Sequence, residues 1–148
     1  MNTTTNNSNP LHISYIAPIG RTLLALIFVI SGMHKVTNFE ATQGYMSTMG
    51  AMPELLPAVI AIEIIAGVLL IIGWHTRLAA LALAGFTVIA SFLFHFDLQD
   101  QMQFILFMKN LSIIGGLLMV VHMGPGCYAL DNRDMYNDDA EDHEHNAL

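Results

Sequence analysis

Two ionisable residues lie inside long apolar runs of the sequence. Glu63 is in the middle of the run from 55 to 72, and Lys109 is near the start of the run from 104 to 123. A lone charge in hydrocarbon costs about 2.5 to 3.5 kcal/mol on insertion scales, so each side chain should face other helices and find a partner. We predict that the two residues share one buried polar network. This network either forms a ligand pocket or is an ion pair that only fixes helix packing.

Other polar residues near the apolar runs complete the candidate pocket. Lysine, histidine and asparagine donate hydrogen bonds to a carbonyl oxygen, and a glutamate relays a proton, which are the functions that a quinone headgroup requires. A site for a lipid headgroup or for a proton needs the same groups. The candidate site residues are Arg21, Lys35, Glu63, His95, Lys109 and Asn110.

The histidines and the cysteine form no recognisable metal or redox motif. Neither an H-x-x-x-H nor a C-x-x-C spacing occurs, and Cys127 is the only cysteine. Structural zinc sites need several such ligands at short spacing, and dithiol chemistry needs two thiols. We therefore predict no metal site, no dithiol centre and no covalently bound cofactor.

Four apolar segments must position the candidate residues. Each has about 18 to 20 residues, which at a helical rise of about 1.5 Å per residue covers a hydrocarbon core of about 30 Å. A soluble helical core is disfavoured, because the third segment has only Thr87 and Ser91 as polar side chains up to Phe94. The sequence predicts an all-α integral membrane protein, a four-transmembrane-helix bundle. The predicted spans are 16–33, 55–72, 78–96 and 104–123.

Composition divides the chain into three parts. Residues 1–14 are polar and predicted to be disordered, 15–131 form the membrane domain, and 132–148 form a disordered acidic tail. Seven of the twelve acidic residues lie from Asp131 onward, so the net charge of -7 belongs largely to the tail. The five cationic residues are scattered singly, which excludes a nucleic-acid-binding surface.

The few cationic residues predict the orientation of the chain. Four spans place both termini on one side of the membrane, with Arg21, Arg77 and Arg133, opposite Lys35 and Lys109. Because Lys and Arg accumulate in cytoplasmic segments, both termini are predicted to be cytoplasmic. The candidate residues that this arrangement gathers at the outer side are Lys35, His95, Lys109 and Asn110.

Several short motifs give the chain a resemblance to a known family. They are Arg21, Ser31-Gly32 followed by Lys35, Tyr45 ahead of Pro53, Glu63 with Gly67, Gly73 with Arg77, Phe92 to His95, Phe107 to Leu111, Gly115-Gly116, and Gly124-Pro125-Gly126 before Asp131. In their order and spacing the chain resembles the DoxX family, and closely its short bacterial inner-membrane branch.

The resemblance implies a multi-pass protein of the bacterial plasma membrane with a connection to redox chemistry. Some members of the family are subunits of a thiosulfate:quinone oxidoreductase, and others belong to membrane-bound oxidative-stress assemblies. The expected function is an accessory or quinone-proximal subunit, with quinone as a non-covalent ligand. The expected partners are the lipid bilayer, redox proteins and a homo-oligomer. Because no flavin, haem or dithiol motif occurs, any enzymatic role is expected to be that of a quinone-linked oxidoreductase subunit and not of a self-sufficient enzyme. The alternative is a non-enzymatic scaffold or a small-solute transporter.

Overall fold

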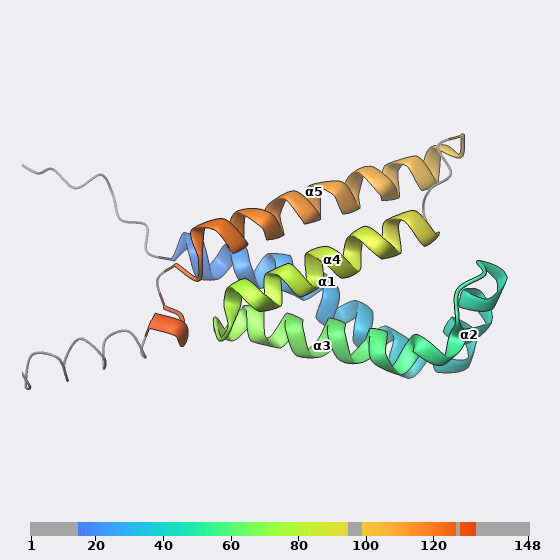
Figure 1. Ribbon diagram of the computed structural model, residues 1–148, viewed down its shortest axis with the longest axis horizontal. Helices are drawn as coiled ribbons and strands as arrows, with labels where there is room; N and C mark the ends of the chain where they lie inside the picture. Colours follow the sequence, from blue (N-terminus) through green and yellow to red (C-terminus); the bar gives the residue numbers. More distant parts are fainter. Residues whose placement is uncertain (1–14, 95–98, 127, 133–148) are drawn as a thin grey trace, which may run out of the picture.

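The protein is a helical bundle, and several of its helices extend beyond the ends of the predicted spans. The computed structural model describes residues 15–94, 99–126 and 128–132, and in this part all regular elements are helices. They are α1 (Ile16–Thr37), α2 (Phe39–Thr48), the 3-10 helix η1 (Pro53–Leu55), α3 (Leu56–Ile72), α4 (Thr76–Phe94) and α5 (Gln101–Met123) (Figure 1). The η1–α3 segment and the three helices α1, α4 and α5 are long and apolar enough to cross a membrane. The predicted four-helix membrane bundle is confirmed.

Helix ends differ from the predicted spans because polar residues continue the helices past the hydrocarbon. α1 runs to Thr37 rather than ending at residue 33, so Lys35 belongs to the helix. α5 begins at Gln101, where the carboxylate of Asp100 accepts hydrogen bonds from two backbone N–H groups of the first turn. The polar connection after α1 contains the short helix α2. The predicted end of the third span and the predicted disordered segment 1–14 lie outside the described residues, as does all of the predicted disordered tail 132–148 except Asn132.

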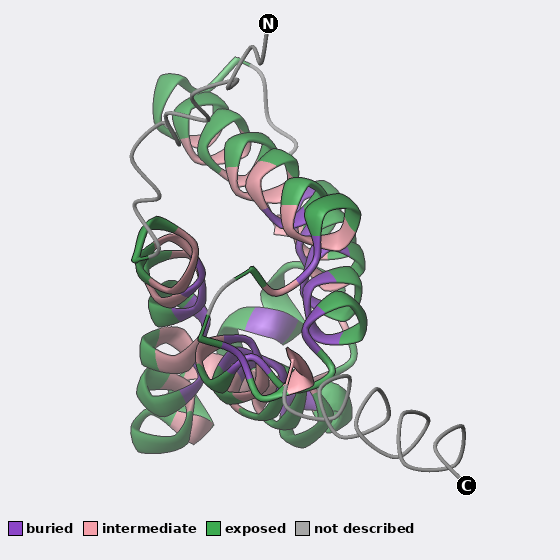
Figure 2. Ribbon diagram, turned by 90° about the vertical axis from the view of Figure 1, so that its left-hand side faces the viewer, coloured by how far each residue is buried: buried purple, intermediate pink, exposed green. Residues whose placement is uncertain are grey.

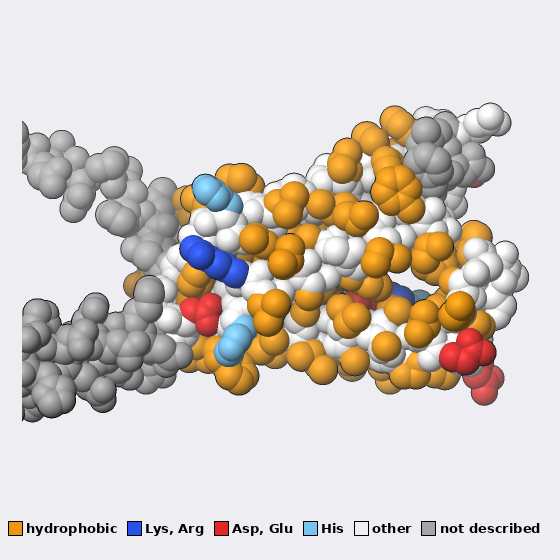
Figure 3. All heavy atoms as spheres, viewed as in Figure 1, with side chains coloured by type: hydrophobic (Ala, Val, Ile, Leu, Met, Phe, Trp, Pro, Cys, Tyr) orange, Lys and Arg blue, Asp and Glu red, His pale blue; other side chains and the backbone are white. Residues whose placement is uncertain are grey.

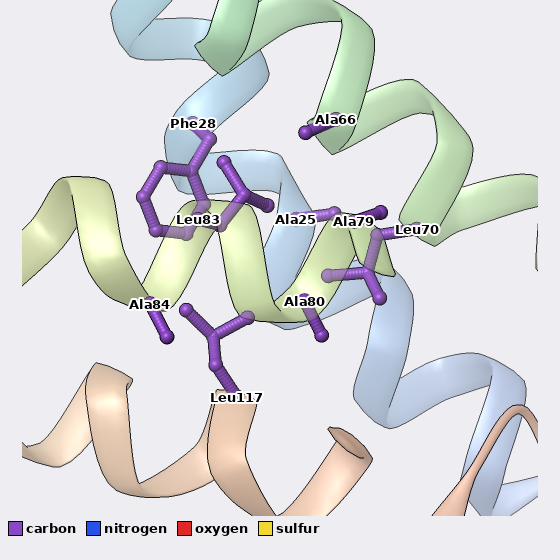
Figure 4. Close-up of a cluster of buried hydrophobic side chains, with 9 residues drawn as sticks. All are labelled: Ala25, Phe28, Ala66, Leu70, Ala79, Ala80, Leu83, Ala84 and Leu117. Carbon is purple, nitrogen blue, oxygen red and sulfur yellow. The ribbon is translucent and has the colours of Figure 1, made fainter. Parts of the chain in front are cut away.

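The bundle consists of two helix pairs joined through α3 and α4. α1 packs along α3, α4 packs along α5, and α3 contacts α4, whereas α1 and α5 touch little. The buried core between them is rich in alanine. Small side chains allow the helices to pack closely, and in lipid close packing replaces the hydrophobic effect as a source of association. The members of this core are Ala25, Phe28, Ala66, Leu70, Ala79, Ala80, Leu83, Ala84 and Leu117 (Figure 4). Viewed end-on, buried surfaces face one another and exposed surfaces face outward (Figure 2).

Two glycines bring α1 and α3 into close contact. A Cβ atom on Gly32 would lie 2.6 Å from Cγ1 of Ile64, and one on Gly67 would lie 2.7 Å from Cγ2 of Val29. Real side chains do not approach so closely, so only glycine allows this separation of the helices. The side chains next to these contacts are therefore held at short range across the α1–α3 interface.

The segment after α5, residues 124–126 and 128–132, folds back over the ends of α3 and α4, and we call it the C-terminal strap. The backbone N–H of Asp131 donates to the carbonyl of Gly73 at 2.9 Å. Its carboxylate accepts the backbone N–H groups of His75 and Thr76 at 2.7 and 2.9 Å. A residue 55 positions away in sequence from Thr76 thus caps the first turn of α4.

Candidate functional site: a pocket beside the Lys35–Glu63 ion pair

Glu63 is buried in the middle of α3 and faces α1. Only 3% of its surface is exposed, and its carboxylate oxygens lie 2.9 and 2.8 Å from Nζ of Lys35. The hydroxyl of Ser31 donates to Oε1 of Glu63 at 3.2 Å, while Nζ of Lys35 donates to Oγ of Ser31 at 2.6 Å. Ser31 and Lys35 share one helix face because they are four residues apart. The three side chains form a closed, charge-balanced network.

The ion-pair partner of Glu63 differs from the predicted one. Glu63 is predicted to share a polar network with Lys109, but its ion pair in the structure is with Lys35. The predicted first span ended at residue 33, which left Lys35 in a loop. Because α1 continues to Thr37, Lys35 lies one helical turn beyond Ser31 and reaches into the bundle.

A pocket of about 360 Å³ lies beside this ion pair, between the α1–α3 pair and the α4–α5 pair. Apolar and aromatic side chains make most of its wall. The lining residues are Ile27, Phe28, Ser31, Lys35, Thr42, Tyr45, Met46, Val59, Glu63, Phe86, Thr87, Ala90, Phe94, Lys109, Asn110 and Ile113. The space-filling view shows an opening at this end of the bundle, with acidic and basic atoms at its base (Figure 3).

Lys109 and Asn110 reach the same pocket from α5. Lys109 is the ninth residue of α5, so its Cα lies about 12 Å along the axis from the start of the helix. Within the described residues, neither side chain has a hydrogen bond or an ion pair. The structure therefore brings four predicted residues, Lys35, Glu63, Lys109 and Asn110, to the wall of one cavity.

The short helix α2 closes one side of the pocket, which the sequence analysis did not foresee. Thr42, Tyr45 and Met46 belong to its wall, and the ring of Tyr45 stacks on Phe94 of α4 with a centroid separation of 5.8 Å. Tyr45 was part of the family resemblance, but nothing in its local pattern placed it at the pocket. Ser31 had a usable signal, since a serine four residues before a lysine lies on the same helix face.

Arg21 and His95 are not part of the described pocket. Arg21 lies at the opposite end of the bundle, 2% exposed, and its guanidinium donates to the carbonyls of Pro125 and Tyr128 in the C-terminal strap. Its inclusion in the candidate site is therefore corrected: the arginine anchors the strap because five donors in a planar fork suit several carbonyl acceptors. His95 lies outside the described residues.

The strap also perturbs an acidic group. Burial alone raises the pKa of the Asp131 carboxyl, but hydrogen bonds from Thr76 and His75, together with the charge of His75, outweigh that effect and hold the pKa below its usual value. The carboxylate also attracts Arg21 electrostatically.

Among the described residues, no three His, Cys, Asp or Glu side chains lie together as metal ligands would. The pocket walls are better suited to an organic ring or chain than to an ion.

Comparison with known proteins identifies the relatives of this bundle. The profile of the DoxX family matches residues 16–96, more than half of the chain. The chain belongs to the DoxX family. It is 40% identical over 113 residues to "Inner membrane protein YqjF" of Escherichia coli (strain K12), covering 76% of this chain and 87% of that protein. It is 34% identical over 122 residues to "Inner membrane protein YphA" of the same organism, covering 78% and 87%.

A more distant relative comes from an animal. The chain is 30% identical over 121 residues to the "Surfeit locus protein 4 homolog" of Drosophila melanogaster, covering 76% of this chain and 38% of that protein. No solved structure matches the chain. The DoxX-family match includes the Lys35–Glu63 pair and ends before α5, so Lys109 and Asn110 come from a part of the pocket beyond it.

Proposed function

We propose that this DoxX-family protein is a quinone-binding accessory subunit of a redox assembly in the bacterial inner membrane. The observation that carries the proposal is the pocket itself, which combines mostly apolar walls with a few polar side chains between the membrane-spanning helices. A lipid-soluble molecule with a polar ring needs that combination. The two Escherichia coli relatives are inner membrane proteins by name, which supports the location.

Each part of the pocket has a role in this proposal. The ring lies between apolar and aromatic walls such as Phe28 and Phe86, and an apolar tail leaves toward lipid. Lys109 and Asn110 donate hydrogen bonds to a ring oxygen. Glu63, bridged to Lys35 and Ser31, is the proton relay. A partner protein exchanges the electrons with the bound quinone.

The proposed orientation places both termini in the cytoplasm and the pocket in the periplasmic half of the membrane. Arg21 and Arg77 lie at the end of the bundle where α1 begins, and Lys35 and Lys109 lie toward the other end. Cysteines introduced at Thr76 and Thr37, in a Cys127→Ser background, report the two ends. The Thr37→Cys chain should react with an impermeant maleimide on intact spheroplasts and the Thr76→Cys chain should not. The reverse pattern overturns the orientation.

Co-purification tests the proposed ligand. The full chain is purified in mild detergent, and the quinone extracted per mole of protein is measured by mass spectrometry. The wild type should retain quinone, Lys109→Met should retain markedly less, and His122→Gln, a change near the other end of α5, should match the wild type. If all three chains retain only trace amounts of quinone, and equally so, the proposal is overturned. Partner proteins that co-purify equally with all three chains would then favour a scaffold.

A further inference from the structure

We infer that the pocket selects a ligand with an anionic oxygen on an apolar body, seated on Lys109 and Asn110. This inference rests on the proposed function for the quinone ring of the ligand. The preference for an anion follows from the charges of the pocket and does not depend on the quinone. Three charged side chains line the described pocket: Lys35, Glu63 and Lys109. Lys35 and Glu63 neutralise each other through two contacts of 2.9 and 2.8 Å. One positive charge remains, on Lys109.

Apart from the phenol of Tyr45, the other polar groups of the wall are bonded within the protein. The hydroxyl of Thr87 donates to the carbonyl of Leu83 at 2.7 Å, and that of Thr42 donates to the carbonyl of Asn38 at 2.8 Å. Ser31 is occupied by the ion pair. The donors that remain for a ligand are therefore the ammonium of Lys109, the amide of Asn110 on the next residue of α5, and the neutral hydroxyl of Tyr45. Of these three groups, only Lys109 carries a charge.

An unmatched ammonium at this depth favours an anion over a neutral carbonyl. Lys109 lines the pocket and is also exposed on the surface of the bundle. About 12 Å along α5, that surface faces lipid, and hydrocarbon penalises the charge strongly, so the pocket is the more favourable place for the ammonium. An anionic oxygen gives a charge-assisted hydrogen bond, roughly twice as strong as a neutral one, and balances the charge at the same time. A deprotonated hydroxyquinone and a fatty carboxylate both present such an oxygen, whereas an unsubstituted quinone does not.

Two ring probes of nearly equal size test this selection. The full chain, in nanodiscs of neutral phosphatidylcholine at neutral pH, is titrated with 2-hydroxy-1,4-naphthoquinone, which is ionised there, and with 2-methyl-1,4-naphthoquinone, which is neutral. Decanoate is the third probe. The ionised ring should bind about tenfold or more tightly than the neutral one, the effect expected of one hydrogen bond to a charged group. Lys109→Met should abolish the preference, and Lys109→Arg should keep it.

The outcomes separate the inference from the proposed function. Equal affinity for the two rings overturns the anion selection and leaves a quinone site standing. Binding of decanoate without either ring supports the anion selection and overturns the quinone function. A preference that survives in a folded Lys109→Met chain overturns the assignment of the donor. Should that variant fail to fold, the comparison of the two rings on the wild type still decides.

Discussion

Lys35 and Glu63 join α1 to α3 through a two-pronged ion pair, with Nζ 2.9 and 2.8 Å from the two carboxylate oxygens. The lysine comes from the last turn of α1, while the glutamate is the eighth residue of α3. The pair therefore spans a difference in depth that a long, flexible side chain covers by extending along the bundle. It neutralises the buried carboxylate and fixes one wall of the pocket.

Breaking this pair should destabilise the bundle more than removing the other pocket lysine. Lys35→Met should cost about 3 kcal/mol, because it leaves the buried Glu63 carboxylate without its partner. Glu63→Gln should cost less, because Lys35 is partly exposed and water reaches its ammonium. The double variant should recover much of the sum of the two losses. Thermal unfolding in detergent measures this cycle, and Lys109→Met is the matched control with a small expected loss. Strictly additive losses would show that the two residues act separately.

The spans were predictable from the sequence because apolar runs of membrane length have few alternatives. The pairing of Glu63 was not, because it depends on how far α1 continues past its apolar part. Polarity marked the end of the first span at residue 33, yet helical hydrogen bonding continues to Thr37. Depth counted along the sequence then favoured Lys109, whereas the close contact of α1 and α3 selects Lys35.

The role of Arg21 was unpredictable for a different reason. Its acceptors are backbone carbonyls of Pro125 and Tyr128, more than 100 residues away. Carbonyl groups leave no trace in a sequence, and Gly124-Pro125-Gly126 indicated only the end of a helix. The location of the pocket between the two helix pairs likewise depends on which helices pack together, and local patterns do not encode that.

The cap formed by Asp131 should matter for stability although it lies near the end of the chain. Asp131→Ala removes the acceptor of two backbone N–H groups at the start of α4, and loss of an N-cap costs about 1 to 2 kcal/mol. Truncation after Asn132 should leave the melting temperature unchanged, because the cap is retained. Comparing both chains with the wild type by thermal unfolding checks this. An Asp131→Ala chain as stable as the wild type would contradict the capping role.

The same cap should make stability depend on acid pH. The folded pKa of Asp131 is below its usual value, so the unfolded chain takes up the proton first as the pH falls. The stabilisation is therefore full above the ordinary carboxyl pKa of about 3.9 and is lost as the pH falls through the lower folded pKa. The difference in melting temperature between wild type and Asp131→Ala should be constant near neutral pH and shrink below about pH 4. A difference in melting temperature that grows on acidification would contradict a lowered pKa of Asp131 in the folded chain.

A glycine under the strap gives a matched pair of substitutions. Gly73 has φ of +73°, and an added Cβ would lie 2.7 Å from Cβ of Ala129 and 2.9 Å from its Cα. Gly73→Ala should therefore cost at least about 1 to 2 kcal/mol, the penalty of a left-handed alanine alone. Gly85 in α4 has open space at that position, so Gly85→Ala should be neutral or slightly stabilising. Equal effects of the two changes on thermal unfolding would show that the strap does not pack on Gly73.

Photolabelling of the full chain with an azido-quinone measures most directly where a quinone binds. Labelled peptides should map to pocket residues such as Met46, Phe86 and Phe94, and excess unlabelled quinone should suppress the labelling. The internal comparison is a purely apolar groove of about 250 Å³ between α3 and α4, which contains Ile65 and Leu78. Labelling confined to that groove, or labelling that excess quinone does not suppress, would contradict the pocket as the quinone site.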